Sequence, residues 1–392
     1  MLPKGWTQSP LGESVRIHSG HAPSDLNLLT EGEIPYVKVE DLNNCEKYQT
    51  DSREYLSACR SVVPAQALIF PKRGAAIFAN KIRIAARPLA LDTNLMGVEV
   101  VSGLDPEYLY YAISSAGLHR LADTSTIPQL NNKHVLPHVL PRPSLKEQRR
   151  IAQILATWDQ AIAMTERLLA NSEKQKLGLI QGLLCGKHRL GGHTAGWQEH
   201  LLGKLFTERV EPNRDDLQLL SITREQGVIL RDDVGRKDTS NEDKSKYLRI
   251  CPGDIGYNTM RMWQGVSALS QYEGIISPAY TVITPGALID GKFASYLFKS
   301  QSVVFLFYRH SQGLVSDTWN LKFSHFAKIK IKIPCIQEQR GIAEVLEKAD
   351  QQIEVIQRQL SALREEKAAL MSQLLTGKRR VMLPDAEAEV QA

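Results

Sequence analysis

Hydrophobic residues recur every three or four positions along two long segments of the chain, and this spacing predicts two long amphipathic helices. Each segment follows a proline and ends before a glycine: Pro143 and Gly186 bound the first, and Pro334 and Gly377 bound the second. A continuous apolar stripe of this kind is typical of a coiled-coil seam. The predicted seam residues include Leu155, Trp158, Ile162, Leu169, Leu346, Ile353, Ile356, Leu360 and Leu363.

Two lysines, Lys176 and Lys367, occupy equivalent positions in the two predicted seams. Two interpretations stay open. A polar seam residue can fix the register of two helices at some cost in stability. Alternatively, the long side chains extend to the helix edge and keep their ammonium groups in water.

The two segments are copies of each other at an offset of 191 residues, and 19 of the 47 positions from Pro143 to Arg189 are identical in the second copy. The same offset relates Gly5-Trp6 to Gly196-Trp197. The chain is therefore a tandem repeat. Each copy joins a front domain, whose sequence differs between the copies, to a helix whose sequence is similar in both. We expect the two helices to pack antiparallel with pseudo-twofold symmetry, and Trp6 and Trp197 to belong to cores.

The front domains alternate short runs rich in Val, Ile and Tyr with helical patterns, which indicates an α+β fold. Strands are predicted within 34–42, 62–70, 81–101, 280–285 and 326–334, and helices over 105–115 and 290–300. The predicted domains are 1–143, helix region 144–190, 191–334, helix region 335–380, and a disordered acidic tail, 381–392.

Composition and charge narrow the function only slightly. The formal net charge of +5 and the isoelectric point near 8.8 permit a nucleic-acid partner without requiring one. No apolar run is long enough for a membrane span and the start lacks the pattern of a signal peptide, so we expect a cytoplasmic protein. Five scattered cysteines are expected to be reduced.

We find no catalytic constellation and expect no metal site. His18 with His21, and His188 with His193, have a spacing that could hold a metal, but their loops offer no further ligands. The segment 286–292 satisfies G-x-x-x-x-G-K, yet Phe293 replaces the Ser or Thr of a phosphate-binding loop, so a turn is favoured. Glu242, Asp243 and Lys244 are interpreted as a solvated loop.

Each predicted helix begins with a shared motif, Glu147-Gln148-Arg149 in the first copy and Glu338-Gln339-Arg340 in the second, and ends in Leu-Leu-x-Gly-Lys. This arrangement resembles the specificity (S) subunits of type I restriction-modification enzymes, also called the HsdS family. The resemblance covers nearly the whole chain, although the front domains resemble the family mainly in layout.

The resemblance implies a non-catalytic DNA-binding subunit in which two target-recognition domains read a bipartite, asymmetric target. The helices would set the spacer and dock two methyltransferase (M) subunits, with restriction (R) subunits bound through M. S-adenosylmethionine, ATP and Mg²⁺ would belong to those partners, with none in this chain. We expect the six motif residues, Glu147, Gln148, Arg149, Glu338, Gln339 and Arg340, to contribute to partner docking.

Candidate DNA contacts are the loop residues able to bind phosphates or base edges. They are Lys72, Arg73, Asn80, Lys81, Thr126, Gln129, Arg224, Arg231, Asn258, Arg261, Gln264 and Thr318. Two alternatives stay open: a coiled-coil scaffold that holds two protein-binding domains without DNA readout, and an enzyme whose site is hidden in the front domains. Salt-dependent DNA binding would distinguish the first from a DNA reader.

Overall fold

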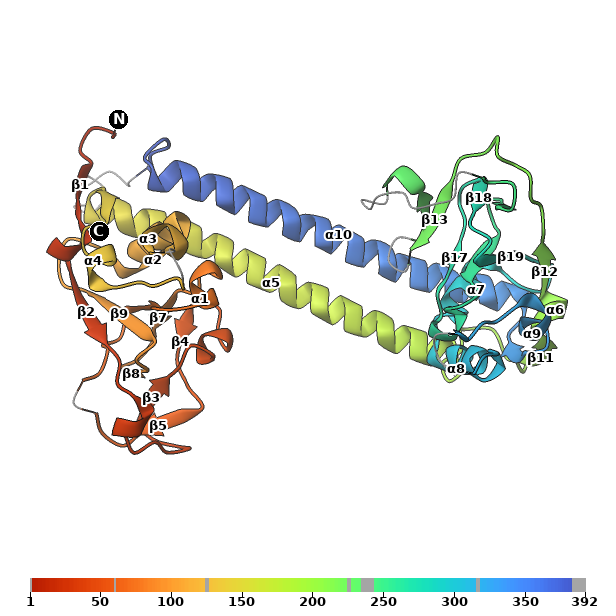
Figure 1. Ribbon diagram of the computed structural model, residues 1–392, viewed down its shortest axis with the longest axis horizontal. Coiled ribbons are helices and arrows are strands. Elements are labelled where there is room, and N and C mark those ends of the chain that lie inside the picture. Colours follow the sequence, from red (N-terminus) through yellow and green to blue (C-terminus); the bar gives the residue numbers. More distant parts are fainter. Residues whose placement is uncertain are drawn as a thin grey trace. The chain divides into compact units, whose positions relative to one another are not determined.

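The computed structural model describes residues 2–59, 61–123, 127–223, 227–233, 243–314 and 318–382 (Figure 1). The chain divides into unit 1, made of Met1–Glu166 and Gln359–Ala392, and unit 2, made of Arg167–Arg358. Each unit therefore combines one front domain with a part of each long helix, a grouping that differs from the linear domain limits expected from sequence.

The two long helices are α5 (Leu145–Leu183) and α10 (Ile336–Leu375). Within unit 1 the helices are antiparallel, because Asp159 of α5 pairs with Lys367 of α10 and the later Glu166 pairs with the earlier Arg364. The described residues contain no helix that combines the length and apolar character needed to cross a membrane.

The front domain of unit 1 contains a five-stranded sheet (β2-β9-β6-β7-β4), a three-stranded sheet (β5-β3-β8) and the pair β1-β10. Its strands are β1 (Thr7–Pro10), β2 (Val15–Ser19), β3 (Ile34–Val37), β4 (Tyr48–Gln49), β5 (Glu54–Leu56), β6 (Leu68–Pro71), β7 (Arg83–Ala85), β8 (Ala90–Leu91), β9 (Leu95–Val100) and β10 (Val139–Arg142). Its helices are α1 (Ala75–Phe78), α2 (Pro106–Ala116), α3 (Leu118–Leu121) and α4 (Asn132–Val135), with short 3-10 turns η1 (Leu11–Glu13), η2 (Pro23–Asp25) and η3 (Asp41–Asn43).

The main core of unit 1 lies where α2 and the five-stranded sheet meet the first turns of α5. Figure 1 shows α2, α3 and α4 beside the start of α5. Asp105 caps α2 by accepting hydrogen bonds from the backbone N–H groups of Glu107 and Tyr108, and this explains why the helix begins where the sequence predicts. Trp6 is buried in this core, as expected.

The front domain of unit 2 contains a four-stranded sheet (β12-β19-β16-β17) and the pairs β11-β20, β13-β14 and β15-β18. Its strands are β11 (Gln198–Leu201), β12 (Phe206–Arg209), β13 (Leu220–Thr223), β14 (Gly227–Leu230), β15 (Leu248–Ile250), β16 (Ile255–Asn258), β17 (Ser267–Leu269), β18 (Gly274–Ile276), β19 (Tyr280–Pro285) and β20 (Lys330–Ile333). Its helices are α6 (Leu202–Leu205), α7 (Gly291–Leu297), α8 (Gln301–His310) and α9 (Phe323–Phe326), with η4 (Arg231–Asp233) and η5 (Met262–Gln264).

Unit 2 differs from the sequence expectation at two elements. The helix predicted over 290–300 ends at Leu297, and α8 begins after Ser300. The strand predicted over 326–334 covers only Lys330–Ile333, because its first residue still belongs to α9. The segment 286–292 is the turn that leads into α7, as its resemblance to the first copy indicates.

The first and last strands of each front domain pair with each other, and the register of this pairing is the same in both domains. Thr7 of β1 pairs with Arg142 of β10, and Gln198 of β11 pairs with Ile333 of β20, so both partners are shifted by the 191-residue repeat. These antiparallel pairs hold the first strand of each domain beside the strand that leads into α5 or α10. The repeat in the sequence is therefore a repeat of structure within each unit.

Candidate nucleic-acid interface

The motif at the start of each long helix fastens the helix to its front domain. In unit 1 the Gln148 side chain accepts a hydrogen bond from the backbone N–H of Asp105 at 2.8 Å and donates to the carbonyl oxygen of Pro143 at 2.9 Å. In unit 2 Gln339 makes the same pair of bonds with Asp290 and Pro334, at 2.9 Å each. The amide thus joins a domain loop to the helix start.

The two glutamates of the motif are likewise held by contacts within the chain. Glu147 and Glu338 are 3% and 0% exposed, and each accepts two hydrogen bonds from an arginine, Arg380 in unit 1 and Arg189 in unit 2. We therefore correct the expectation that Glu147, Gln148, Glu338 and Gln339 form a docking surface, because their side chains are buried in contacts within the chain. Of the six residues, Arg149 and Arg340 have largely exposed side chains.

A second repeated contact joins each front domain to both long helices. The Tyr111 hydroxyl donates to Asp159 of α5, and Asp159 also pairs with Lys367 of α10. Unit 2 repeats this with Tyr296, which donates to Asp350 at 2.6 Å, and with Lys176, which pairs with the same carboxylate. Both seam lysines therefore form ion pairs across the helix pair, which favours the register-fixing interpretation over simple extension into water.

These contacts have electrostatic consequences. Burial, followed by the hydrogen bond to Asp159, raises the pKa of Tyr111, and burial together with Asp350 raises the pKa of Tyr296. Burial and the nearby Lys176 ammonium lower the pKa of Lys299, which lies beside this cluster in unit 2. The two tyrosines thus remain neutral hydrogen-bond donors to a carboxylate that the seam lysine balances.

The remaining predicted seam residues lie on the helix-facing side of α5 and α10. Leu155, Leu346, Ile356 and Leu360 are buried. Trp158, Ile162, Leu169, Ile353 and Leu363 are half-buried. Positions between them, such as Met164 and Leu177, are exposed by 68% and 59%. The burial pattern thus follows the predicted spacing.

Two loops that are far apart in the sequence meet in unit 1, and we call them the unit 1 loop pair: residues 71–74 and 127–131. The backbone N–H of Leu130 donates to the Lys72 carbonyl at 2.8 Å, and Arg73 and Gln129 face each other across an antiparallel bridge. The Arg73 side chain is exposed, and Lys72 and Gln129 are half-buried. Three predicted DNA contacts are therefore brought together.

Unit 2 forms the equivalent unit 2 loop pair from residues 258–264 and 318–321. The backbone N–H of Leu321 donates to the Thr259 carbonyl at 2.8 Å, and Leu321 is Leu130 shifted by the repeat. Of the predicted contacts, Arg261, Gln264 and Thr318 are exposed and Asn258 is half-buried. The same two connections thus meet in both units, although their residues differ.

An aromatic cluster supports the unit 2 loop pair. The Trp263 indole N–H donates to the Met260 carbonyl at 3.0 Å, and the Trp263 ring packs edge-on against Trp319 with centroids 5.3 Å apart. Tyr308 of α8 packs against Trp319 in turn, at 5.0 Å. Met260 and Arg261 are consequently exposed at the tip of a turn whose base is held by aromatic rings.

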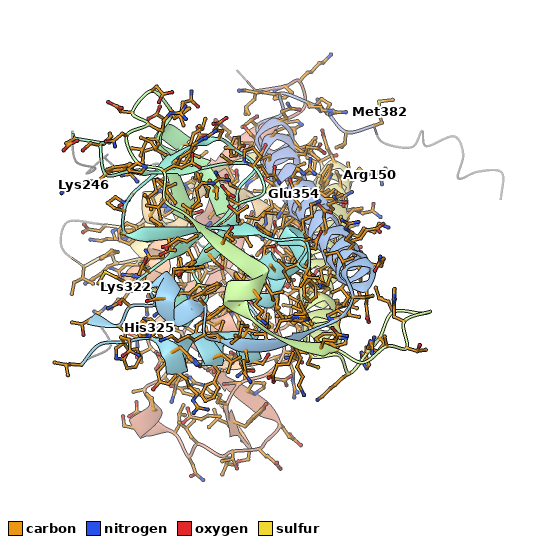
Figure 2. The ribbon with its side chains drawn as sticks, turned by 90° about the vertical axis from the view of Figure 1, so that its right-hand side faces the viewer. Arg150, Lys246, Lys322, His325, Glu354 and Met382 are labelled. Atoms are coloured by element: carbon orange, nitrogen blue, oxygen red, sulfur yellow. The ribbon has the colours of Figure 1, made fainter. Side chains whose placement is uncertain are left out.

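Two further polar side chains lie next to the unit 2 loop pair. Lys322 follows Leu321 directly, and His325 lies on the first turn of α9; Figure 2 shows both side chains at the outside of the domain. His325 is the repeat partner of His134 in α4 of unit 1. Sequence reasoning missed these two residues. For His325 the available signal was its repetition at the 191-residue offset, whereas Lys322 corresponds to Asn131 and had no such signal.

The other predicted DNA contacts do not belong to the two loop pairs. The Asn80 side chain donates to the Ser114 carbonyl and accepts from the Leu118 N–H, both at 2.9 Å, so we correct Asn80 to a structural residue that holds the end of α2. Lys81 donates to Asn43, and Arg231 donates to Ser221 within the β13-β14 hairpin. Thr126 and Arg224, like Glu242 and the tail from 383 onward, lie outside the described residues.

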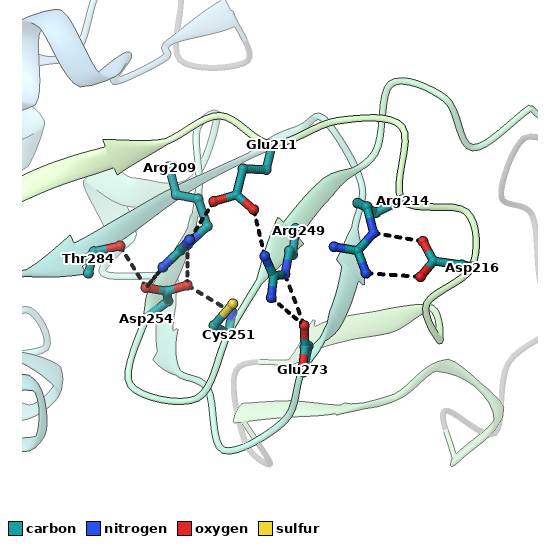
Figure 3. A network of polar contacts seen from close by, with 9 residues as sticks. All are labelled: Arg209, Glu211, Arg214, Asp216, Arg249, Cys251, Asp254, Glu273 and Thr284. Atoms are coloured by element: carbon teal, nitrogen blue, oxygen red, sulfur yellow. Dashed lines mark hydrogen bonds and ion pairs between the residues drawn. The ribbon is translucent and has the colours of Figure 1, made fainter.

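A network of ion pairs crosses the sheets of unit 2, and Figure 3 shows it. Arg209 of β12 binds the buried Asp254 at 2.8 Å and Glu211 at 2.6 Å, and Arg249 binds Glu211 and Glu273. Hydrogen bonds from Arg249 and Arg209 hold the pKa of Glu211 below its usual range. Each carboxylate of this network is neutralised by a guanidinium, so the network braces strands and offers no general base.

The two units share the same helical frame, and each presents a loop pair with guanidinium and amide groups, as expected of a DNA-reading protein with two recognition domains. The chain belongs to the family described as the type I restriction modification DNA specificity domain, whose model matches residues 3–173 and 229–365.

Known specificity subunits resemble the chain over nearly its whole length in one case and over about half of it in another. The type I restriction enzyme MjaVIII specificity subunit of Methanocaldococcus jannaschii is 22% identical over 416 residues, covering 97% of this chain and 94% of that protein. The MjaIX specificity subunit of the same organism is 27% identical over 190 residues, covering 46% of this chain. The chain spans 44% of the length of that second relative.

Solved structures share the fold. A type I restriction-modification S subunit from M. genitalium has a TM-score of 0.58 at 15% identity, covering 94% of this chain and 96% of that chain. A chain from a study of complex assembly and conformational transition of the type I R-M system has a TM-score of 0.60 at 17% identity, covering 97% of this chain and 100% of that one. The α+β fold with two repeated domains and long helices is therefore confirmed.

Proposed function

We propose that this chain is the non-catalytic DNA-specificity subunit of a type I restriction-modification complex and reads a bipartite, asymmetric target. The observation that carries the proposal is the repeated loop pair, closed by Leu130 N–H to Lys72 in unit 1 and by Leu321 N–H to Thr259 in unit 2. A conserved frame with divergent loop residues is what a reader of two half-sites needs, because phosphate contacts position a protein and base contacts specify the sequence.

The loop residues support different half-sites for the two units. Unit 1 offers Arg73 and Gln129, whose guanidinium and amide suit guanine and adenine edges. Unit 2 offers Arg261 and Gln264 together with the apolar Met260, which is 50% exposed. An apolar side chain can contact the thymine methyl group. Met260 follows Thr259 in unit 2, whereas Arg73 follows the equivalent Lys72 in unit 1, so we expect the two half-sites to differ in sequence.

The long helices serve as spacer and as docking frame in this proposal. Each unit contains a part of both long helices, and in this proposal the helix length sets the spacer between the half-sites. Arg149 and Arg340 are repeated, and their side chains are 71% exposed, which suits two equivalent docking places for two methyltransferase subunits. Restriction subunits bind through M, and S-adenosylmethionine, ATP and Mg²⁺ belong to these partners. The complex acts in the cytoplasm, where it meets DNA.

The proposal is tested by co-expressing the chain with its methyltransferase subunit and mapping modified bases in the host genome by single-molecule sequencing. The expected result is one split motif with two unlike half-sites and a fixed gap. A complex that assembles without any motif would instead favour the coiled-coil scaffold without DNA readout. Salt-dependent binding of the purified complex to the mapped site gives a second readout.

A further inference from the structure

Three side chains that commonly bind metals converge in unit 2, next to the start of α10. They are His193, from the segment between α5 and β11, and Cys335 and Glu338, from the N-terminal end of α10. Their ligand atoms all lie within 4.8 Å of one another, and the His193 Nδ1 and Cys335 Sγ atoms are 3.7 Å apart. No metal was expected at His193 because its loop offers no further ligands; Cys335, which approaches it in the structure, lies 142 residues further along the chain.

The equivalent place in unit 1 is built differently. Shifting by the repeat, His193 and Cys335 correspond to Leu2 and Ser144, so both soft ligands are particular to unit 2. Glu147, the counterpart of Glu338, accepts hydrogen bonds from Arg380 and also from the Trp6 indole N–H at 3.1 Å. Unit 1 therefore uses this carboxylate entirely within the chain.

Glu338 accepts two side-chain hydrogen bonds from the described residues where Glu147 accepts three, so it keeps more acceptor capacity. It accepts two hydrogen bonds from Arg189 at 2.7 Å each, whereas the buried indole N–H of Trp197, the repeat partner of Trp6, has no hydrogen-bond partner among the described residues. A carboxylate offers about four lone-pair sites. Two of these remain on Glu338, on a side chain that Arg189 orients, as outer-shell partners orient metal ligands.

We propose that His193, Cys335 and Glu338 form a binding site for a zinc-type divalent cation in unit 2. Thiolate with imidazole selects such metals over magnesium or calcium, and a carboxylate is an accepted third ligand. On binding, the Cys335 thiol releases its proton to solvent and the thiolate sulfur coordinates the metal.

Room for the remaining ligand exists beside the cluster. A pocket of about 280 Å³ reaches the cluster at Cys335, the one proposed ligand among its lining residues, and leaves room there for a water molecule as a fourth ligand. The metal would tie the segment that follows α5 to the beginning of α10. Metal binding would therefore stabilise the contact between this segment and α10 in unit 2. It would have no role in chemistry on DNA.

The test uses the full chain, reduced and freed of metal, titrated with Co²⁺ as a spectroscopic substitute for Zn²⁺. We expect one equivalent to bind with a thiolate-to-cobalt charge-transfer band, which Zn²⁺ then removes by displacement. The band should vanish in Cys335→Ser, and the affinity should fall at least about tenfold in His193→Ala. Zn²⁺ should also raise the unfolding temperature of the wild-type chain.

Cys185→Ser is the matched control, because Cys185 is likewise exposed in unit 2 and lies outside the cluster. Its band should equal that of the wild type. Circular dichroism of each variant shows whether the helices remain intact. No charge-transfer band in the wild type, or a band that survives in Cys335→Ser, would overturn the proposal. The experiment needs neither DNA nor a partner, so its outcome is independent of the proposed function.

Discussion

Arg380 donates two hydrogen bonds to the carboxylate of Glu147, at 2.6 and 2.9 Å, across 233 residues of sequence. The guanidinium also lies 5.8 Å from the centre of the Trp6 ring. Since Glu147 begins α5 and Arg380 follows α10, this pair fixes where the end of one helix meets the start of the other. Arg189 and Glu338 repeat the relationship in unit 2, which explains why the helix ends are better preserved between the copies than the front domains.

Replacing Glu147 by Gln should therefore loosen the end of α10 in unit 1. The change leaves Arg380 without its charge partner, and because Arg380 is half-exposed we expect a loss of about 1–3 kcal/mol, below the cost for a fully buried pair. Hydrogen exchange of the amides in the last turns of α10 measures the effect. Glu344→Gln, which removes a surface pair with Lys348, should change exchange very little. Equal effects of the two variants would contradict this role of Glu147.

Leu360→Asp should separate the helices of unit 1 and weaken assembly with the methyltransferase subunit. Leu360 is 6% exposed on the seam, so a carboxylate there is buried without a partner at a cost of about 3 kcal/mol. Leu360→Ala is a milder variant in case the first fails to fold, and Leu177→Asp is the control because Leu177 is 59% exposed. Size-exclusion chromatography of the co-expressed pair measures assembly. Unchanged assembly of the Leu360 variants would count against the helices as a spacing device.

The sequence predicted the two long helices and the tandem repeat, because these features depend on local periodicity and on residues shared at one offset. It misread the Glu and Gln residues of the Glu-Gln-Arg motif as a docking surface, since similarity between copies does not distinguish a buried contact from an exposed one. It could not foresee the role of Asn80, whose backbone adopts a positive φ of 50° and whose partners lie in α2 and α3. The Arg209–Asp254 pair and the His193–Cys335 contact likewise depend on tertiary proximity alone.

Unit 1 should lose stability in mild acid through His138. Burial lowers the pKa of this imidazole, and its Nε2 atom is buried without a hydrogen-bond partner among the described residues. The unfolded chain therefore binds a proton at a higher pH than the folded chain, so stability falls as the pH drops below about 6.5. The repeat partner of His138 is Ile329, which is buried in unit 2. His138→Ile should thus be tolerated and should reduce the acid-induced fall in the unfolding temperature; an unchanged pH profile would exclude His138 as the cause.

The tip of the unit 2 loop pair should read two chemical groups of one half-site, through Arg261 and Met260. Arg261→Ala should cost about 1–3 kcal/mol and relax specificity at one base pair, because a bidentate guanidinium contact to guanine is lost. Replacing that guanine by 7-deazaguanine should weaken wild-type binding and leave Arg261→Ala unaffected. Replacing thymine by deoxyuridine removes only the methyl group. This substitution should lower the DNA affinity of the wild type and leave the affinity of Met260→Ala unchanged.

Binding of the assembled complex to the mapped target, with one base substituted at a time, separates these residues from the rest of the protein. The distal half-site provides the internal control, since its substitutions should affect the wild type and both variants equally. Arg73→Ala is the matched variant in unit 1. It should become insensitive to base substitutions in the half-site that unit 1 reads, while it still responds to substitutions in the half-site that unit 2 reads. If the wild type binds its target and yet no position distinguishes it from Arg261→Ala or Met260→Ala, the tip of this loop pair does not read bases, although the chain still reads DNA.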